Sequence, residues 1–392
     1  MVTESFNVGV GTTGSSSIFL ELNVWAIRVF SSFVWTATNT WHGSQCLRVL
    51  LTCIWPSYLN LDSEFADGTM KVYDLISFIL YFQLCLPLMW FSPENYRKPS
   101  LFASTTVVEA VFVLLIWSTA RAGGGGPLLA DVSKVSGIKP AQGGNLGWAF
   151  VAAVTANIGG IATHIWSQSD YTGYARKPGD PVLAQLIMVP IGTIFVACIG
   201  IICASCEATL YPNEGKESCY GSPTPSSLLC ARTRLKFRRS GWGCVRQYRF
   251  MLSQFGMVAA SNCVVAGIDL AALLPPWFTI RRGGYFTTVF VFVLVMQPSS
   301  LLNSASNFLT VVGSFNVFLG PLRGIMFADY FLIRKRTMEL TDMYGDSPDS
   351  IYWYNRDWNL RAAVSWVLGA WMFIPGLAQR ATAPSEVQAG WT

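Results

Sequence analysis

Long apolar runs recur throughout this chain, and they limit the folds it can adopt more than any other feature of the sequence. A helix needs roughly 20 apolar residues to cross a hydrocarbon layer about 30 Å thick, and about nine such runs follow one another. Hydrophobic residues make up 52% of the 392 residues and charged residues only 12%, which is not the composition of a soluble domain of this length. The sequence therefore predicts an all-α polytopic membrane protein. The predicted spans are residues 23–54, 73–92, 101–119, 146–166, 182–205, 251–274, 285–302, 304–332 and 360–378.

Positively charged residues gather in alternate connections between the predicted spans. Cytoplasmic loops carry an excess of Lys and Arg, so we expect these connections to be cytoplasmic, with the N-terminus inside and the C-terminus outside. The net charge of +5 is small, so the expected large partner is the lipid bilayer and not a nucleic acid. The basic connections contain Arg97 and Lys98, Arg176 and Lys177, Arg281 and Arg282, and Arg334, Lys335 and Arg336.

Two segments do not fit a series of spans. Residues 1–22 are polar and rich in Gly and Ser, so we expect a polar N-terminal remnant that is neither a span nor a signal peptide. Residues 206–250 are predicted to form an atypical basic loop on the external side, against the usual distribution of charge, and we interpret this loop as the product of a gene-model error. Residues 381–392 are expected to form a C-terminal tail.

The first predicted span carries polar residues in one stripe. Trp35, Asn39, His42 and Cys46 follow the spacing i, i+4, i+7, i+11, which puts all four on one side of a helix. Lipid cannot satisfy the hydrogen bonds of Asn39 or His42, so the stripe is expected to face protein or a water-filled cavity. Both alternatives stay open, because Asn and His side chains also hold membrane helices together.

A second polar face lies in a later span. Asn262 and Asp269 are seven residues apart in a run of small residues, and this pattern predicts that a neighbouring helix approaches closely. Asp269 leads toward Arg281 and Arg282, so an ion pair with an interfacial arginine competes with a role in coupling.

Three acidic residues are the candidates for coupling or gating: Asp170, Asp269 and Asp329. Each lies near the predicted cytoplasmic end of a span beside Arg or Lys, so a structural ion pair is the alternative for each. Asp170 follows a span that Gly159 and Gly160 interrupt, and such a pair allows either close helix packing or a broken helix.

Catalytic motifs are absent from the sequence. It contains two His residues and no HExxH, GxSxG or Walker loop, so we predict no enzyme, no ATP-driven pump, no catalytic residue and no cofactor. The ten Cys residues lie mostly inside apolar runs, so we expect no metal site and no disulfide framework.

Three strings resemble signature segments of the nucleobase–cation-symport-1 family, above all its fungal uracil, uridine, allantoin and thiamine permeases. They are SQSDYTGYARKPGDPVLAQL, NCVVAGIDLAALLPPWFTIRRGGY and FLGPLRGIMFADYFLIRKR. The resemblance implies a LeuT-type five-plus-five inverted repeat with a substrate site at mid-membrane. On this register residues 23–205 resemble family helices three to seven and residues 251–380 resemble helices eight to eleven. We therefore expect an incomplete set, with about nine of the twelve helices.

The resemblance also implies a substrate site. Family members carry Trp-x-x-x-Gln on the third helix, where the ring stacks on a planar heterocycle and the amide bonds its edge. Trp35 and Asn39 stand at those positions, and Asn39 is one methylene shorter than Gln. Asn262 matches the substrate-binding Asn of the eighth helix, and Ile161 stands where a second stacking Trp would be.

Both histidines are added as candidate substrate contacts: His42, with helix packing as its alternative, and His164. The hydroxyl positions that hold sodium in bacterial members correspond to Gly256 and Met257, so the resemblance implies coupling to protons, as in the fungal branch. The expected function is a plasma-membrane permease that imports a nucleobase, nucleoside, allantoin or thiamine-like nitrogen heterocycle. The alternative is a non-transporting truncated or mis-annotated product, or a sensor-like membrane protein.

Overall fold

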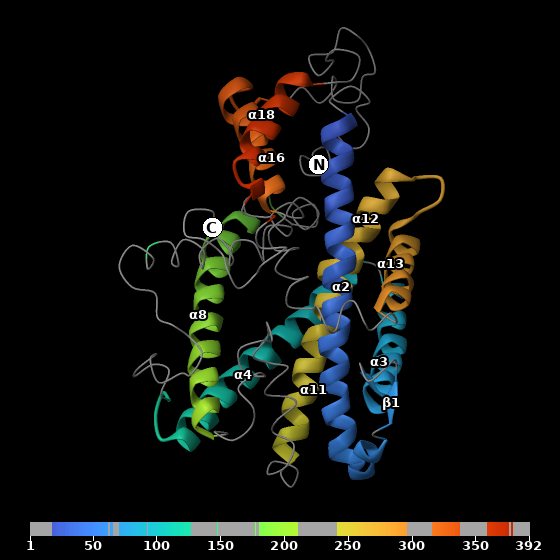
Figure 1. The fold of residues 1–392 in the computed structure, drawn as a ribbon, viewed down its shortest axis with the longest axis vertical. Helices are drawn as coiled ribbons and strands as arrows, with labels where there is room; N and C mark the ends of the chain where they lie inside the picture. The colour runs from blue at the N-terminus through green and yellow to red at the C-terminus, as the bar shows by residue number, and fades with distance from the viewer. Residues whose placement is uncertain are drawn as a thin grey trace.

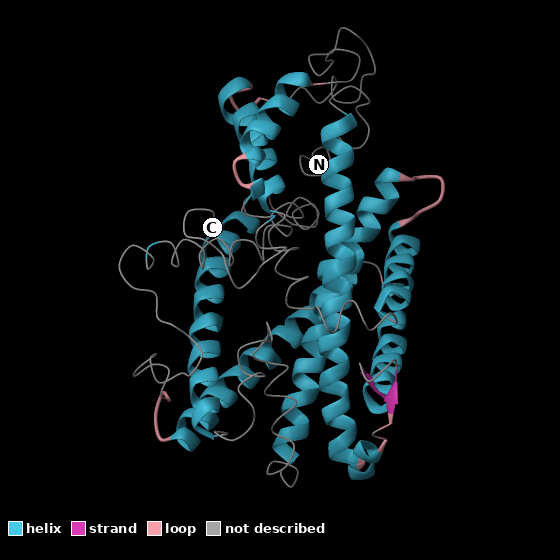
Figure 2. Cartoon of the chain, in the orientation of Figure 1, coloured by secondary structure: helices cyan, strands magenta, loops and turns pink. Residues whose placement is uncertain are grey.

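The computed structural model describes residues 18–61, 63–65, 70–91, 93–126, 180–210, 241–295, 316–337 and 359–375, with Gly147, Lys177 and Ala378. Helices dominate these residues, and two short strands, β1 (Glu64–Phe65) and β2 (Met70–Lys71), pair antiparallel at one end (Figure 2). The helices before residue 130 are α2 (Ile18–Ile54), η1 (Pro56–Asn60), α3 (Val72–Cys85), η2 (Leu86–Trp90), η3 (Pro93–Tyr96) and α4 (Arg97–Ala122). Those after it are α8 (Asp180–Leu210), α11 (Gly241–Gly256), η6 (Met257–Cys263), α12 (Val264–Leu273), α13 (Ile280–Val295), α16 (Asn316–Phe327), η7 (Ala328–Ile333) and α18 (Leu360–Trp371).

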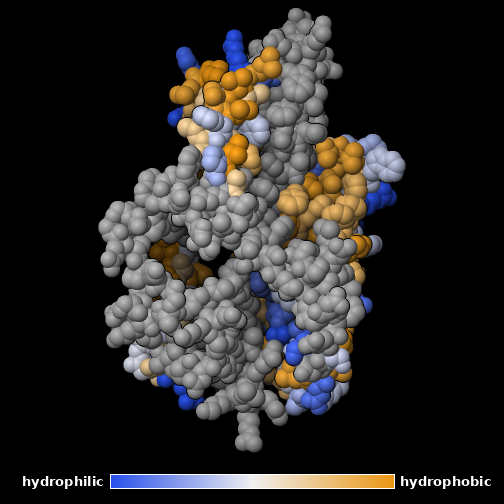
Figure 3. Space-filling model, viewed as in Figure 1, coloured by the Kyte–Doolittle hydropathy of each residue, from blue (hydrophilic) through white to orange (hydrophobic). Residues whose placement is uncertain are grey.

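Several helices are built to cross a bilayer. Within the described ranges, four are long and apolar enough to do so: Val72–Trp90, Lys98–Ala122, Gln185–Cys206 and Gln247–Leu273. Apolar side chains also cover much of the visible surface over α13 and α18 (Figure 3). Exposed apolar residues of these two helices include Phe286, Val289, Val367 and Leu368. A surface of this kind is stable in lipid and not in water. The protein is therefore an integral membrane protein.

The long helix α2 is the centre of the arrangement (Figure 1). It packs against α3, α11, η6, α12 and α13. Gly43 permits the contact with α3, because a Cβ atom at this position would overlap the ring of Tyr81. The core between these helices consists of buried apolar side chains such as Cys46, Leu47, Cys85 and Val258.

Helices α12 and α13 form a close antiparallel hairpin. A Cβ atom on Gly283 would lie 2.7 Å from the Cα atom of Gly267, so only glycine allows the two backbones to come this close. Small residues are the usual means by which membrane helices approach each other. The close approach predicted from the small residues around Asn262 is therefore confirmed, and α13 is the neighbour.

Two further helix pairs surround this centre. Helix α4 packs against α8 through Leu114, Ile199 and Cys203. Helices α16 and α18 are joined by a hydrogen bond in which the indole Nε1 of Trp366 donates to the Phe318 carbonyl over 2.9 Å.

Helix α11 begins ten residues before the predicted start of its span, at Gly241 instead of residue 251. Gln247 and Met251, one turn apart, are buried, whereas Val245 and Tyr248 are exposed, which is a helical pattern. The prediction of a loop through residue 250 is thus wrong for residues 241–250, and also for residues 206–210, which belong to α8. The predicted span began where the apolar run begins, because residues 241–250 are more polar. A helix can continue beyond the apolar layer, and α11 does so. Residues 211–240 lie outside the described residues.

Candidate functional site

Helix α2 continues without a break through the predicted polar stripe. Trp35, Asn39 and His42 are half-buried on it, and Cys46 is buried in the core. The same spacing extends backward to Arg28, seven residues before Trp35, so that a charged residue heads the stripe. Arg28 is not among the site residues predicted from the sequence, although a charge inside a span on the same helical face as Trp35 was a usable signal.

Arg28 forms a buried ion pair with Asp269 of α12. Its Nη2 lies 2.8 Å from Oδ1, and its Nε donates to Oδ2 over 3.1 Å. The two side chains are 8% and 2% exposed. This two-point geometry is the strongest form of an arginine–carboxylate contact. The expected ion pair between Asp269 and an arginine is present, but the arginine is Arg28 of α2 and neither Arg281 nor Arg282.

The ion pair fixes how α2 and the α11–η6–α12 segment lie against each other. Eight residues further along α2, the Thr36 hydroxyl lies 3.9 Å from the Cys263 sulfur, which precedes Asp269 by six residues. The two segments are therefore antiparallel. Seven residues from each member of the ion pair, Trp35 and Asn262 come to the same level of the two helices.

Asn262 has an unusual environment. Asn262 is 3% exposed, and its amide Nδ2 has no hydrogen-bond partner among the described residues. It belongs to the π-helical segment η6, and π-helical turns often occur at functional sites. A buried amide nitrogen without a partner costs about 1–3 kcal/mol, which a ligand that accepts its hydrogen bond can recover.

A second polar cluster lies toward the other end of α2. Arg48 pairs with Asp74 of α3, to which the Gln45 amide also donates over 3.4 Å. The Tyr58 hydroxyl donates to the Tyr73 carbonyl over 2.8 Å. Burial raises the pKa of Tyr58, which keeps this hydroxyl protonated and able to donate. This cluster was not predicted from the sequence.

One ion pair lies on each side of the stripe on α2. Arg28 and Arg48 are twenty residues apart, a separation of about 30 Å along a helix, which is about the thickness of the hydrocarbon layer. Asn39 lies close to the midpoint. The stripe therefore lies between the two ion pairs, within one turn of the level of Asn262.

Asp329 has a local role. Arg334 donates its Nε to Asp329 Oδ2 over 2.8 Å, and its backbone N–H donates to the Asp329 carbonyl over 2.8 Å at the end of η7. The ion-pair alternative predicted for Asp329 is thus confirmed. Three other predicted site residues, Ile161, His164 and Asp170, lie outside the described residues.

The predicted sodium positions offer no side-chain oxygen. Gly256 ends α11 and Met257 begins η6, and the Met257 sulfur accepts a long contact from the Ser261 hydroxyl at 3.8 Å. Across the described part of the chain, no group of three or more His, Cys, Asp or Glu residues is arranged to hold a metal ion. The side chains of Trp35, Asn39 and Asn262 suit a hydrogen-bonding ligand with a flat face.

Comparison with known proteins gives relatives along almost the whole chain. The uridine permease of Saccharomyces cerevisiae is 28% identical over 373 residues, which are 94% of this chain and 57% of that protein. The allantoin permease of the same yeast is 24% identical over 387 residues, 97% of this chain and 59% of that protein. An uncharacterized permease of Schizosaccharomyces pombe is 28% identical over 381 residues, 95% and 61%. The chain therefore spans less than two thirds of the length of these curated relatives.

Solved structures share the fold. Mhp1, a nucleobase-cation-symport-1 family transporter, in a closed conformation with bromovinylhydantoin bound, is 20% identical with a TM-score of 0.59, covering 96% of this chain and 76% of that chain. Its inward-facing conformation is 17% identical with a TM-score of 0.61, covering 95% and 71%. The predicted fold class, an all-α polytopic protein of the LeuT type, is confirmed. Residues 6–390 match the family described as permeases for cytosine/purines, uracil, thiamine and allantoin, and the chain belongs to this family.

Proposed function

We propose that the protein is a secondary transporter that moves a flat nitrogen heterocycle across the membrane. The observation that carries the proposal is that Trp35 and Asn262 lie at the same level of two antiparallel helices, each seven residues from its own member of the buried Arg28–Asp269 ion pair. A π-face and a buried amide nitrogen with no hydrogen-bond partner among the described residues fit a planar ring with a polar edge. Family membership supports transport as the activity, since the named relatives are permeases.

Each residue of the proposed site has a distinct task. Trp35 stacks on the face of the ring, and Asn262 donates its amide N–H to a ring carbonyl. Asn39, one turn beyond Trp35, bonds the ring edge. His42, about one turn after Asn39 on α2, is proposed as a further substrate contact. Ile161 and His164 stay proposals from the resemblance, as does a coupling role for Asp170.

The relatives narrow the substrate class without fixing it. They are named for uridine, uracil, allantoin and thiamine, and the bound ligand of Mhp1 is a hydantoin. All five molecules contain a flat ring with nitrogen atoms in it. We propose that the protein imports its substrate at the plasma membrane. We also propose that import is coupled to protons, because Gly256 and Met257 replace the hydroxyls that hold sodium in bacterial members.

Uptake by cells that lack their own permeases tests the proposal. Cells expressing the chain are offered radiolabelled uracil, uridine, allantoin and thiamine, and we expect saturable uptake of at least one. Asn262→Ala should reduce this uptake at equal surface expression, because the ring carbonyl loses a donor in a dry site. Asn359→Ala is the matched control, since the Asn359 side chain accepts a hydrogen bond from the Ala362 backbone N–H at the start of α18. Unchanged uptake in Asn262→Ala would remove this residue from the site.

A further inference from the structure

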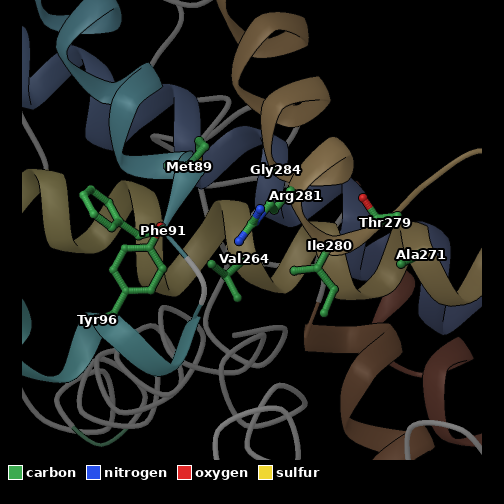
Figure 4. Close-up of a pocket in the computed structure, with 9 residues that line it drawn as sticks. All are labelled: Met89, Phe91, Tyr96, Val264, Ala271, Thr279, Ile280, Arg281 and Gly284. Atoms are coloured by element: carbon green, nitrogen blue, oxygen red, sulfur yellow. The ribbon is translucent and has the colours of Figure 1, made fainter.

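A cavity of about 490 Å³ lies between the η2–η3 connection and the α12–α13 hairpin (Figure 4). Its walls are mostly apolar, with Met89 and Phe91 on the η2 side and Val264 and Ile280 on the hairpin side. Its volume is within the range of small-molecule sites, which is about 300–1,000 Å³. None of Trp35, Asn39, His42 or Asn262 lines it, so the cavity is distinct from the proposed substrate site.

One cationic group enters this apolar cavity. In Figure 4 the guanidinium of Arg281 projects over Val264, with the Phe91 and Tyr96 rings on one side and Ile280 on the other. The guanidinium carbon lies 5.6 Å from the centre of the Trp90 ring. Among the described residues no carboxylate forms an ion pair with Arg281. The cavity thus combines an available positive charge with apolar walls.

The surroundings of the cavity are those of a membrane interface. Trp90 is 66% exposed and Trp277 is 75% exposed, and exposed Trp side chains gather where the hydrocarbon layer meets water. Arg281, Arg282 and Lys98 are all exposed at this end of the hairpin and of α4. Both connections are among those predicted to be cytoplasmic, and the cytoplasmic leaflet carries the anionic lipids.

We propose that this cavity binds an anionic phospholipid, with the phosphate at Arg281 and the upper part of an acyl chain against Met89, Val264 and Ile280. A soluble phosphate would leave the apolar walls in contact with water. A lipid without net charge would gain less from Arg281. A bound lipid would bridge the η2–η3 connection and the α12–α13 hairpin, and so stabilise their contact.

Native mass spectrometry of the purified full chain tests the proposal. The protein is titrated with phosphatidylserine and, separately, with phosphatidylcholine, and the retained lipid is counted. Arg281→Gln should weaken phosphatidylserine binding about fivefold, since one cationic residue near anionic lipid is worth about 1 kcal/mol. Phosphatidylcholine binding should change much less. Arg361→Gln is the matched control, because Arg361 is also exposed but lies on α18, away from the cavity.

A second variant separates the tail contact from the charge. Ala271→Phe places a ring in the cavity and should weaken the binding of both lipids while Arg281 remains. Equal phosphatidylserine binding by the wild type and Arg281→Gln would overturn the proposal. An equal loss in Arg361→Gln would also overturn it, because bulk charge would then explain the affinity. Displacement of phosphatidylserine by inorganic phosphate at similar concentration would identify a simple anion site instead of a lipid site.

Discussion

The ion pair between Arg28 and Asp269 gives a sharp prediction about stability. Both side chains are almost fully buried and the contact has two points, so removal of one partner takes this contact away from a charge that stays in the protein interior. Breaking a buried pair in this way costs about 3–5 kcal/mol. We therefore expect Asp269→Asn and Arg28→Gln each to lower the free energy of unfolding by an amount of this size.

The double variant carries the more specific expectation. With both charges gone, Arg28→Gln/Asp269→Asn should be less destabilised than the sum of the two single variants, by up to about 3 kcal/mol, the usual limit of coupling between contacting residues. Equilibrium unfolding of the solubilised protein in mixed micelles, followed by tryptophan fluorescence, measures all three variants. Asp329→Asn is the control, since the Asp329 side chain is 38% exposed and its pair with Arg334 should contribute no more than about 1 kcal/mol. A double variant whose loss of unfolding free energy equals the sum of the two single losses would refute the pairing.

Three further predictions concern packing, recognition and coupling. Gly43→Ala should destabilise the protein by about 1–3 kcal/mol, because the added methyl group would overlap the Tyr81 ring. Gly320→Ala should cause no such loss, because the space around Gly320 is open. Thermal unfolding compares the two variants. Trp35→Ala should weaken ligand binding by about 1–3 kcal/mol if stacking is the main contact, as measured by equilibrium binding. Trp90→Ala, which removes an exposed Trp, should cause no such loss. Uptake should rise as external pH falls and stay constant when sodium is replaced by choline; a sodium-dependent transport current would contradict proton coupling.

The shared helical face of Trp35, Asn39 and His42 could be predicted from the sequence because α2 is a continuous α-helix. The spacing of Trp35, Asn39 and His42 fixes one helical face whatever the helix packs against. The same argument placed Asn262 and Asp269 on one face of a later helix. Local periodicity of this kind needs no knowledge of the rest of the fold.

Contacts between distant helices could not be predicted in this way. Arg28 and Asp269 are 241 residues apart in the sequence, and only the antiparallel packing of α2 and α12 brings them together. The nearer arginines, Arg281 and Arg282, were the reasonable partners from sequence alone. The π-helical turn around Asn262 likewise follows no residue pattern that the sequence analysis used.

Photocrosslinking tests the central claim most directly, because it locates the ligand instead of inferring its position. Whichever of uracil, uridine, allantoin and thiamine binds best is used in a photoactivatable radiolabelled form on the purified chain, and the adduct is mapped by mass spectrometry. We predict adducts on the α2 peptide that contains Trp35 and Asn39, and on the η6 peptide that contains Asn262, both abolished by excess unlabelled ligand. Competable adducts confined to peptides outside α2 and η6 would contradict the proposed site.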